Sequence, residues 1–357
     1  MIDKKNWRLA QKYLDYRFEV DLIAKGSLKK EQVHIRHLIE WAQDKPFHRA
    51  MGIRPTFPEY MLSARLDGED GQLSAGYIKK TLATARLFFI WLSDNETGYK
   101  HIKQSWIKTV KNKRLASTPK NAEAVSLEEI LTIAARPAQA AQARRARAAM
   151  VFLYLSGMRI GAFVSLPLQA VDIPHLTVNQ FPSLGVKTKL GKSATTFLLN
   201  IPELLKVVQD WDDEVRAILP PTGFWFAPLS STTGEIDPSI KSIGEHRITL
   251  ARKNFKAWLE QEDLPYHSPH KFRHGHIQYG NDKANTISQM KAVSLNVMHS
   301  SMKITDATYS NLQDNQVKSI ISGLNKNTSS NNNDDDNETF KKFKKFLEWE
   351  KENNNPA

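Results

Sequence analysis

Residues 268–276 read SPHKFRHGH and residues 298–309 read MHSSMKITDATY, and these two segments decide how the rest of the chain is interpreted. The first contains His270 and Arg273, and the second contains His299 and, ten positions later, Tyr309. A phenol has a free pKa near ~10 and is a poor nucleophile, so a catalytic Tyr needs a base to take its proton and cations to stabilise its target. A planar guanidinium for the non-bridging oxygens and two imidazoles for proton transfer would suit an attack on a phosphodiester.

Length and charge suggest two domains and a polyanionic partner. The chain has 357 residues, which exceeds the size at which a single core usually stops growing. Its net charge is +12 and its pI about 9.5. Residues 1–120 hold 23 Lys and Arg against 13 Asp and Glu, a net +10, so residues 121–357 hold only +2. The positive charge is therefore concentrated at the amino-terminal end.

The absence of Cys excludes disulfides, thiolate metal sites and Cys nucleophiles, and fits a reducing compartment. No apolar run approaches the roughly 20 residues of a membrane span, and the first residues lack the apolar core of a signal peptide. We expect a soluble, cytoplasmic protein without a membrane partner.

The apolar periodicity predicts a helical first domain. Residues 1–23 form a leader helix, and a helical domain follows over residues 24–115. Within it, Val33, Ile35, Leu38, Ile39 and Trp41 lie near helical spacing, and so do Ile78, Leu82, Leu87, Phe88 and Trp91, with Ser74 as the N-cap. Residues 100–120 contain seven Lys or Arg and no acid, which fits either a solvated linker or a connector along a phosphate backbone.

Residues 116–325 are predicted to form a second, mixed α+β domain, so the fold class is mainly α with a small β-sheet. Ser126 and Glu129 have the spacing of a capping box, and an apolar helix is expected to end at Gly157. Residues 176–181, 183–187 and 194–199 read as short strands, with KTKLGK (187–192) as the turn between the last two. Helices are expected again over 202–215, 243–262 and 311–324.

Residues 326–357 are predicted to be a low-complexity linker and a carboxy-terminal amphipathic helix. The stretch NTSSNNNDDDNE (327–338) cannot bury apolar area. The segment TFKKFKKFLEWEKE (339–352) then places aromatic residues at helical spacing opposite Lys. Such a helix is either a docking element for another subunit or an incidental tail.

Taken together, SGMRIGAFVSL (156–166), KTKLGK, HKFRHGH (270–276) and MHSSMKITDATYSNL (298–312) resemble the tyrosine recombinase, or phage integrase, family. The likeness spans nearly the whole chain, because that family also has a helical core-binding domain ahead of its catalytic domain. By this resemblance Arg159 and Arg273 match the two Arg that clamp the scissile phosphate. His270 matches the residue that assists proton removal from the Tyr, and His299 the one that donates a hydrogen bond to the phosphate.

The family's general-acid Lys lies in a β-hairpin turn and reaches into the minor groove. Lys189 is the choice here, with Lys187 and Lys192 as close rivals. Tyr309 is similar to the family nucleophile, and Tyr279 is the alternative. The position three residues after the first Arg, often acidic in the family, is Ala162, which puts the groups that support the active site in doubt.

His267, His270, His274 and His276 also allow a metal-site hypothesis, because His270 and His274 share a helix face at i, i+4. No Glu stands in the zincin arrangement, so His274 and His276 are interpreted as structural or DNA-facing and no cofactor is expected.

The resemblance implies a site-specific DNA recombinase that joins its Tyr to a 3′ phosphate, binds double-stranded DNA and works as a tetramer on two sites. Type IB topoisomerases and telomere resolvases share this chemistry but give relaxed circles or hairpin ends instead of exchanged strands. A DNA-binding protein without catalysis is the third alternative.

Overall fold

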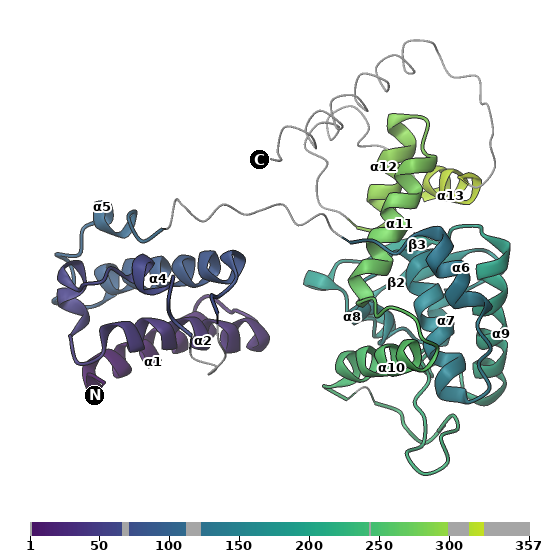
Figure 1. The fold of residues 1–357 in the computed structure, drawn as a ribbon, viewed down its shortest axis with the longest axis horizontal. Coiled ribbons are helices and arrows are strands. Elements are labelled where there is room, and N and C mark those ends of the chain that lie inside the picture. The colour runs from purple at the N-terminus through teal and green to yellow at the C-terminus, as the bar shows by residue number, and fades with distance from the viewer. Residues whose placement is uncertain (1, 66–70, 112–122, 243, 299–313, 325–357) are drawn as a thin grey trace. The chain divides into compact units, whose positions relative to one another are not determined.

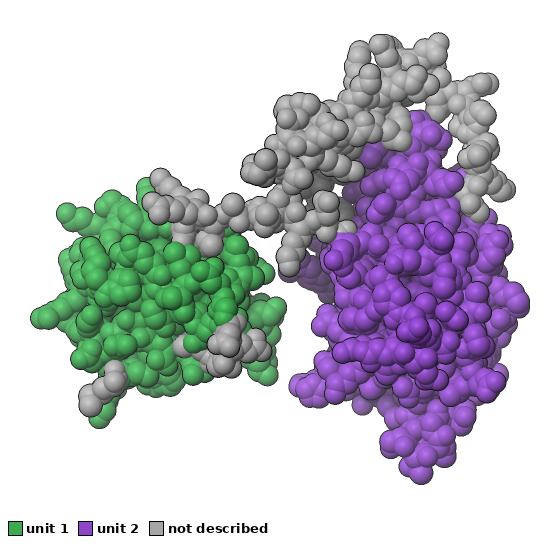
Figure 2. Space-filling view, viewed as in Figure 1, with its two compact units in different colours: residues 1–119 green, residues 120–357 purple. Residues whose placement is uncertain are grey.

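The computed structural model describes residues 2–65, 71–111, 123–242, 244–298 and 314–324, and it divides into two compact units. Unit 1 comprises residues 1–119 and unit 2 residues 120–357, and Figure 2 shows them in green and purple. Each unit has its own hydrophobic core. The predicted tail helix at 339–352, together with His299 and Tyr309, lies outside the described residues.

The regular elements in the described part of unit 1 are all helices (Figure 1). Its elements are α1 (Lys4–Glu19), α2 (Lys25–Ala42), η1 (Phe47–Gly52), α3 (Phe57–Tyr60), α4 (Ala75–Asn95) and α5 (Gln104–Ile107). Aromatic side chains fill the core, where the rings of Tyr13 and Phe47 lie 5.3 and 5.1 Å from that of Phe88. Because α1 contributes Tyr13 to this core, the leader helix is an integral part of unit 1.

The predicted cap of α4 is confirmed, since the Ser74 side chain accepts a hydrogen bond from the backbone N–H of Tyr77. Two of the residues assigned to apolar faces are in fact exposed. Val33 and Leu87 have exposed fractions of 50% and 45%. Both sit at the edges of faces whose centres, such as Leu38 and Phe88, already fill the core.

Unit 2 is built around α7 (Ala141–Ser156), which packs against four other helices (Figure 1). Those helices are α6 (Leu127–Ala135), α9 (Pro202–Ile218), α10 (Arg247–Gln261) and α11 (Pro269–Lys283); the short α8 (Ile160–Phe163), α12 (Ile287–Asn296) and α13 (Asp314–Gly323) complete the helical part. Every side chain from 148 to 156 is buried, as expected of a helix surrounded on all sides. The capping box of Ser126 and Glu129 is confirmed.

The small sheet is an antiparallel meander in the order β1 (Val171–Asp172), β2 (Thr177–Gln180) and β3 (Ala194–Phe197). The mainly α fold with one small sheet is therefore confirmed. The strand predicted over 183–187 is wrong. Pro182 opens the 3₁₀ helix η3 (Pro182–Leu184), and Gly185 follows with φ +84°, so the backbone there is not extended. As a result, β2 and β3 are joined by the long loop 181–193 and not by a tight turn at KTKLGK.

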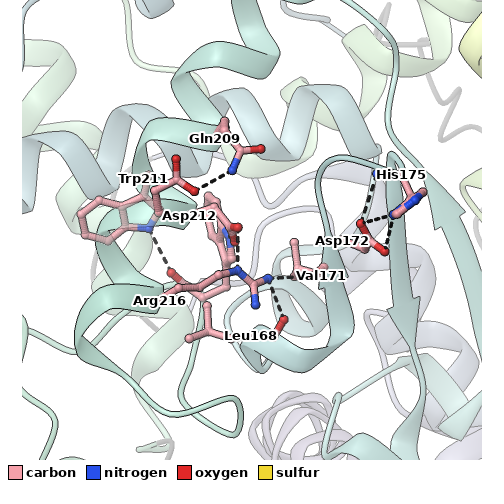
Figure 3. Close-up of polar contacts among 10 residues, drawn as sticks. Leu168, Val171, Asp172, His175, Gln209, Trp211, Asp212 and Arg216 are labelled. Atoms are coloured by element: carbon pink, nitrogen blue, oxygen red, sulfur yellow. Dashed lines mark hydrogen bonds and ion pairs between the residues drawn. The ribbon is translucent and has the colours of Figure 1, made fainter.

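A buried polar network fixes the start of the sheet to α9 (Figure 3). Asp212 accepts hydrogen bonds from the Trp225 indole at 2.9 Å and from Nε of Arg216 at 2.7 Å. Arg216 then donates from Nη2 to the backbone oxygens of Leu168 and Val171. The carboxylate is 3% exposed and fully paired, so this ion pair holds β1 against the helical body.

No helix in the described ranges is long and apolar enough to cross a membrane.

Candidate active site

The turn between α7 and α8 presents Arg159. Helix α7 ends at Gly157, which has the left-handed φ of +61° that glycine adopts without strain. A Cβ at this position would lie 2.7 Å from the ring of His276 and from Val297, so only glycine fits. Two residues later Arg159 is the half-buried N-cap of α8, in an extended conformation.

Arg273 of α11 is bonded to this same turn. Its guanidinium donates from Nη1 to the backbone oxygen of Gly157 and from Nη2 to that of Val297, both at 2.5 Å. The side chain is only 2% exposed. Burial, and next the charge of Arg159, lower the pKa of Arg273 to about 10, so it remains charged at neutral pH. The structure thus brings the two predicted Arg within electrostatic range of each other.

His270 lies one turn before His274 on α11, and their ring centroids are 4.3 Å apart. The pKa of His270 is lowered first by burial and then by the charges of His274, Arg273 and Arg159. A lowered pKa keeps the imidazole neutral near pH 7, the state in which it can accept a proton. Three of the predicted site residues, Arg159, His270 and Arg273, therefore form one cluster.

His276 has a structural position and does not face solvent. It is fully buried, and its Nδ1–H donates to the backbone oxygen of Tyr154 at 2.9 Å, which leaves Nε2 as an acceptor. Burial lowers its pKa to about 4. The described residues include no group of three or more His, Cys, Asp or Glu that could share a metal ion.

Asn296 completes this interior and was not predicted. Its Nδ2 approaches Nε2 of His276 at 3.3 Å and donates to the backbone oxygen of Phe197 at 2.9 Å, while its Oδ1 accepts from the Phe197 N–H at 2.7 Å. The amide side chain thus pairs with β3 as a neighbouring strand would. An isolated Asn carries no sequence signal for such a contact, because its partner lies 99 positions away.

All three candidate Lys lie on the loop 181–193. Lys187, Lys189 and Lys192 are exposed, and Lys189 begins the short 3₁₀ helix η4 (Lys189–Gly191). The backbone N–H of Lys187 donates to the Ser165 hydroxyl at 2.8 Å. Ser165 follows α8 by two residues, so the base of the loop is attached next to the element that Arg159 caps.

Two further predicted residues can be placed only by sequence. His299 and Tyr309 lie outside the described ranges; the last described residue before them, Met298, follows the Val297 carbonyl that binds Arg273. Tyr279, the alternative nucleophile, is 7% exposed and packs near Tyr154, with 6.5 Å between ring centroids.

Ala162, where an acid is often found in the family, is 3% exposed. It is enclosed in the hydrophobic core of unit 2.

No protein-family model matches the chain, and no curated protein matches its sequence. Among solved structures, the chain is similar to the Tn1549 transposon integrase in complex with circular intermediate DNA, with a TM-score of 0.54 and 13% identity over 88% of this chain and 98% of that one. For the same integrase in complex with transposon right end DNA, the TM-score is 0.52 and the identity 14%, over 89% of this chain and 98% of that one. For a lambda integrase dimer bound to a core site, the TM-score is 0.48 and the identity 16%, over 91% of this chain and 79% of that one.

At these identities the likeness shows the fold alone, and it rests on the Tn1549 integrase structures, whose TM-scores of 0.54 and 0.52 are above 0.5. Their coverage includes both units of the chain, since 88% of 357 residues cannot be drawn from unit 2 only. The chain therefore has the mainly α-helical fold of the tyrosine recombinases, which its sequence motifs indicated.

Proposed function

We propose that this chain is a site-specific DNA recombinase that cuts and rejoins strands through a covalent 3′-phosphotyrosine. Tyr309 attacks a phosphodiester, and a bond forms between its phenol oxygen and phosphorus while the bond to the 5′ oxygen breaks. The phenol proton passes to His270, and the leaving oxygen takes a proton from Lys189. The released 5′-hydroxyl of a partner strand then reverses the reaction.

The observation that carries the proposal is the cluster of Arg159, His270 and Arg273 around one turn. Two guanidinium groups can neutralise the non-bridging oxygens, whose charge grows in the transition state. The neighbouring neutral imidazole is suited to take up the phenol proton. In this proposal His299 donates a hydrogen bond to the same phosphate.

The covalent intermediate keeps the energy of the phosphodiester, so the proposed reaction needs neither ATP nor a metal ion. The DNA partner is supported by the fold, since the Tn1549 integrase structures are complexes with DNA. The net charge of +10 on residues 1–120 would supply phosphate contacts, and affinity should fall steeply with salt. Exchange between two duplexes needs four active sites, so we also propose a tetramer assembled on DNA.

Covalent trapping tests this function. The purified chain is incubated with nicked duplexes of random sequence, in which the short strand beyond the cleavage point diffuses away and prevents religation. Denaturing gels then separate protein joined to DNA, and sequencing of the joined strand gives the target. Wild type should form an adduct and Tyr309→Phe none. Equal adduct in both would show that the nucleophile is misassigned, and no adduct in wild type would refute the recombinase function.

The two Arg provide a second test. Arg159→Ala or Arg273→Ala should reduce the single-turnover rate of adduct formation by about two orders of magnitude or more, as removal of an oxyanion donor does. Arg252→Ala, on the exposed face of α10, is the matched control and should leave the rate unchanged. Near-normal rates in both site variants would mean that the phosphate binds elsewhere.

A further inference from the structure

The tip of the loop 181–193 carries an exposed apolar side chain, which does not stabilise the protein in the absence of a ligand. Leu190 is 83% exposed, the largest exposed fraction among the large hydrophobic residues of the described chain. Its backbone is left-handed, with φ +62° and ψ 23°, and Gly191 follows with φ +65°. A side chain with a Cβ is strained in this conformation, which Gly or Asn adopts more easily. The position therefore carries a residue that is unfavourable in both conformation and solvation.

The surroundings of Leu190 indicate what could cover it. Lys187, Lys189 and Lys192 are exposed on either side, and the loop contains no Asp or Glu. Three cations around one apolar tip match a polyanion that also offers apolar surface, and the deoxyribose and base edges of a DNA groove offer both. The base of the loop is fixed, because Val186 is 2% exposed and Lys187 is bonded to Ser165. The tip thus projects from a rigid attachment beside Arg159.

We propose that Leu190 inserts into the DNA minor groove as an apolar wedge, with Lys187 and Lys192 on the flanking phosphates and Lys189 at the leaving oxygen; this rests on the proposed function. The minor groove is about 6 Å wide, too narrow for a helix but open to the tip of a loop. Apolar side chains such as Leu are the residues that minor-groove proteins place between base steps. Leu190 then contributes to DNA affinity without contributing charge. Its strained backbone at φ +62° serves the contact with DNA and does not stabilise the folded chain.

Binding of the full chain to a labelled linear duplex of mixed sequence tests the wedge, and fluorescence anisotropy over a range of salt concentrations is the readout. Leu190→Asn should raise the Kd about tenfold at every salt concentration, because it loses apolar burial but no charge. The slope of log K against log salt should stay unchanged. Lys192→Ala should instead lower that slope by about 0.9, the value for one phosphate contact.

One control variant, one stability measurement and one competitor distinguish groove insertion from a general loss of apolar surface or of stability. Leu250→Asn removes a Leu that is 44% exposed on α10 and should leave the Kd unchanged. Leu190→Asn itself should melt at the wild-type temperature or higher, since Asn tolerates the left-handed conformation. A minor-groove ligand such as distamycin, at saturation, should abolish the difference between wild type and Leu190→Asn.

Equal Kd values for wild type and Leu190→Asn would overturn the wedge, and so would a difference that survives distamycin. A lowered melting temperature that accounts for the weaker binding would overturn it as well. None of these outcomes involves cleavage, so failure of the wedge is distinguishable from failure of the recombinase function, which covalent trapping measures.

Discussion

Replacing Asn296 by Ala should destabilise unit 2 strongly, because three buried groups depend on that one side chain. The amide satisfies the N–H and the carbonyl of Phe197 at 2.7 and 2.9 Å and approaches Nε2 of His276 at 3.3 Å. Asn296 itself is 1% exposed, and His276 is fully buried, so water has no direct access to the groups left behind. The substitution therefore removes partners without supplying replacements.

Each buried polar group left unsatisfied costs about 1–3 kcal/mol. The two bonds to Phe197 have good geometry and the contact with His276 is long, so we expect a total loss of about 3 kcal/mol. For a domain of this size, about 1 kcal/mol shifts Tm by roughly 2–4 °C. The melting transition of unit 2 should accordingly fall by about 6–12 °C, while that of unit 1 stays in place.

Thermal and urea unfolding, followed by circular dichroism and by differential scanning calorimetry, measure this change. Asn179→Ala is the matched control, since Asn179 lies on β2 and its side chain accepts a single hydrogen bond from the described residues, from the Thr195 hydroxyl at 3.3 Å. It should cost less than about 1 kcal/mol. If Asn296→Ala lowers the stability of unit 2 no more than Asn179→Ala does, the pairing of Asn296 with β3 does not hold the interior together.

Gly157→Ala should cost unit 2 about 3 kcal/mol in urea unfolding, because the left-handed φ adds ~1–2 kcal/mol and the new Cβ meets His276 and Val297 at 2.7 Å. Gly185→Ala, at φ +84° and with no described atom within 4 Å of the new Cβ, should cost only the conformational part. Equal losses in the two variants would contradict the clash at Gly157. The pKa of His276 is about 6.5 in the unfolded chain and is lowered to about 4 in the folded one. Between these two pH values the unfolded state therefore binds an extra proton. The free energy of unfolding should fall as the pH drops through that window, by up to about 1.4 kcal/mol per pH unit. The difference in unfolding free energy between wild type and His276→Gln should shrink accordingly from pH 7 to pH 5, and a constant difference would show that His276 does not titrate in this way.

Local signals in the sequence predicted the parts of the fold that depend on neighbouring residues. Ser74 and Ser126 cap their helices as expected, and α7 ends at Gly157, because capping and the left-handed conformation involve residues within one turn. Helix α13 also falls within the segment predicted for it. The grouping of the motif residues was predicted by resemblance, and the structure brings Arg159, His270 and Arg273 into one cluster.

The parts that the sequence did not predict depend on distant contacts or on competing local preferences. Residues 183–187 alternate as a strand would, but Pro182 and Gly185 interrupt the extended backbone. The burial of His276 follows from its contact with Tyr154, 122 positions away, which no local pattern reveals. The pairing of Asn296 with β3 is of the same kind.

In the proposed reaction, Arg159 and Arg273 act on one phosphate by neutralising its charge. The most direct test replaces a non-bridging oxygen of the scissile phosphate by a methyl group, which gives an uncharged methylphosphonate in the trapping substrate. Single-turnover adduct formation by Arg159→Ala should then recover at least tenfold relative to the ordinary phosphate, because the missing cation has no charge left to stabilise. An Arg159→Ala rate that stays equally low on both substrates would contradict the claim.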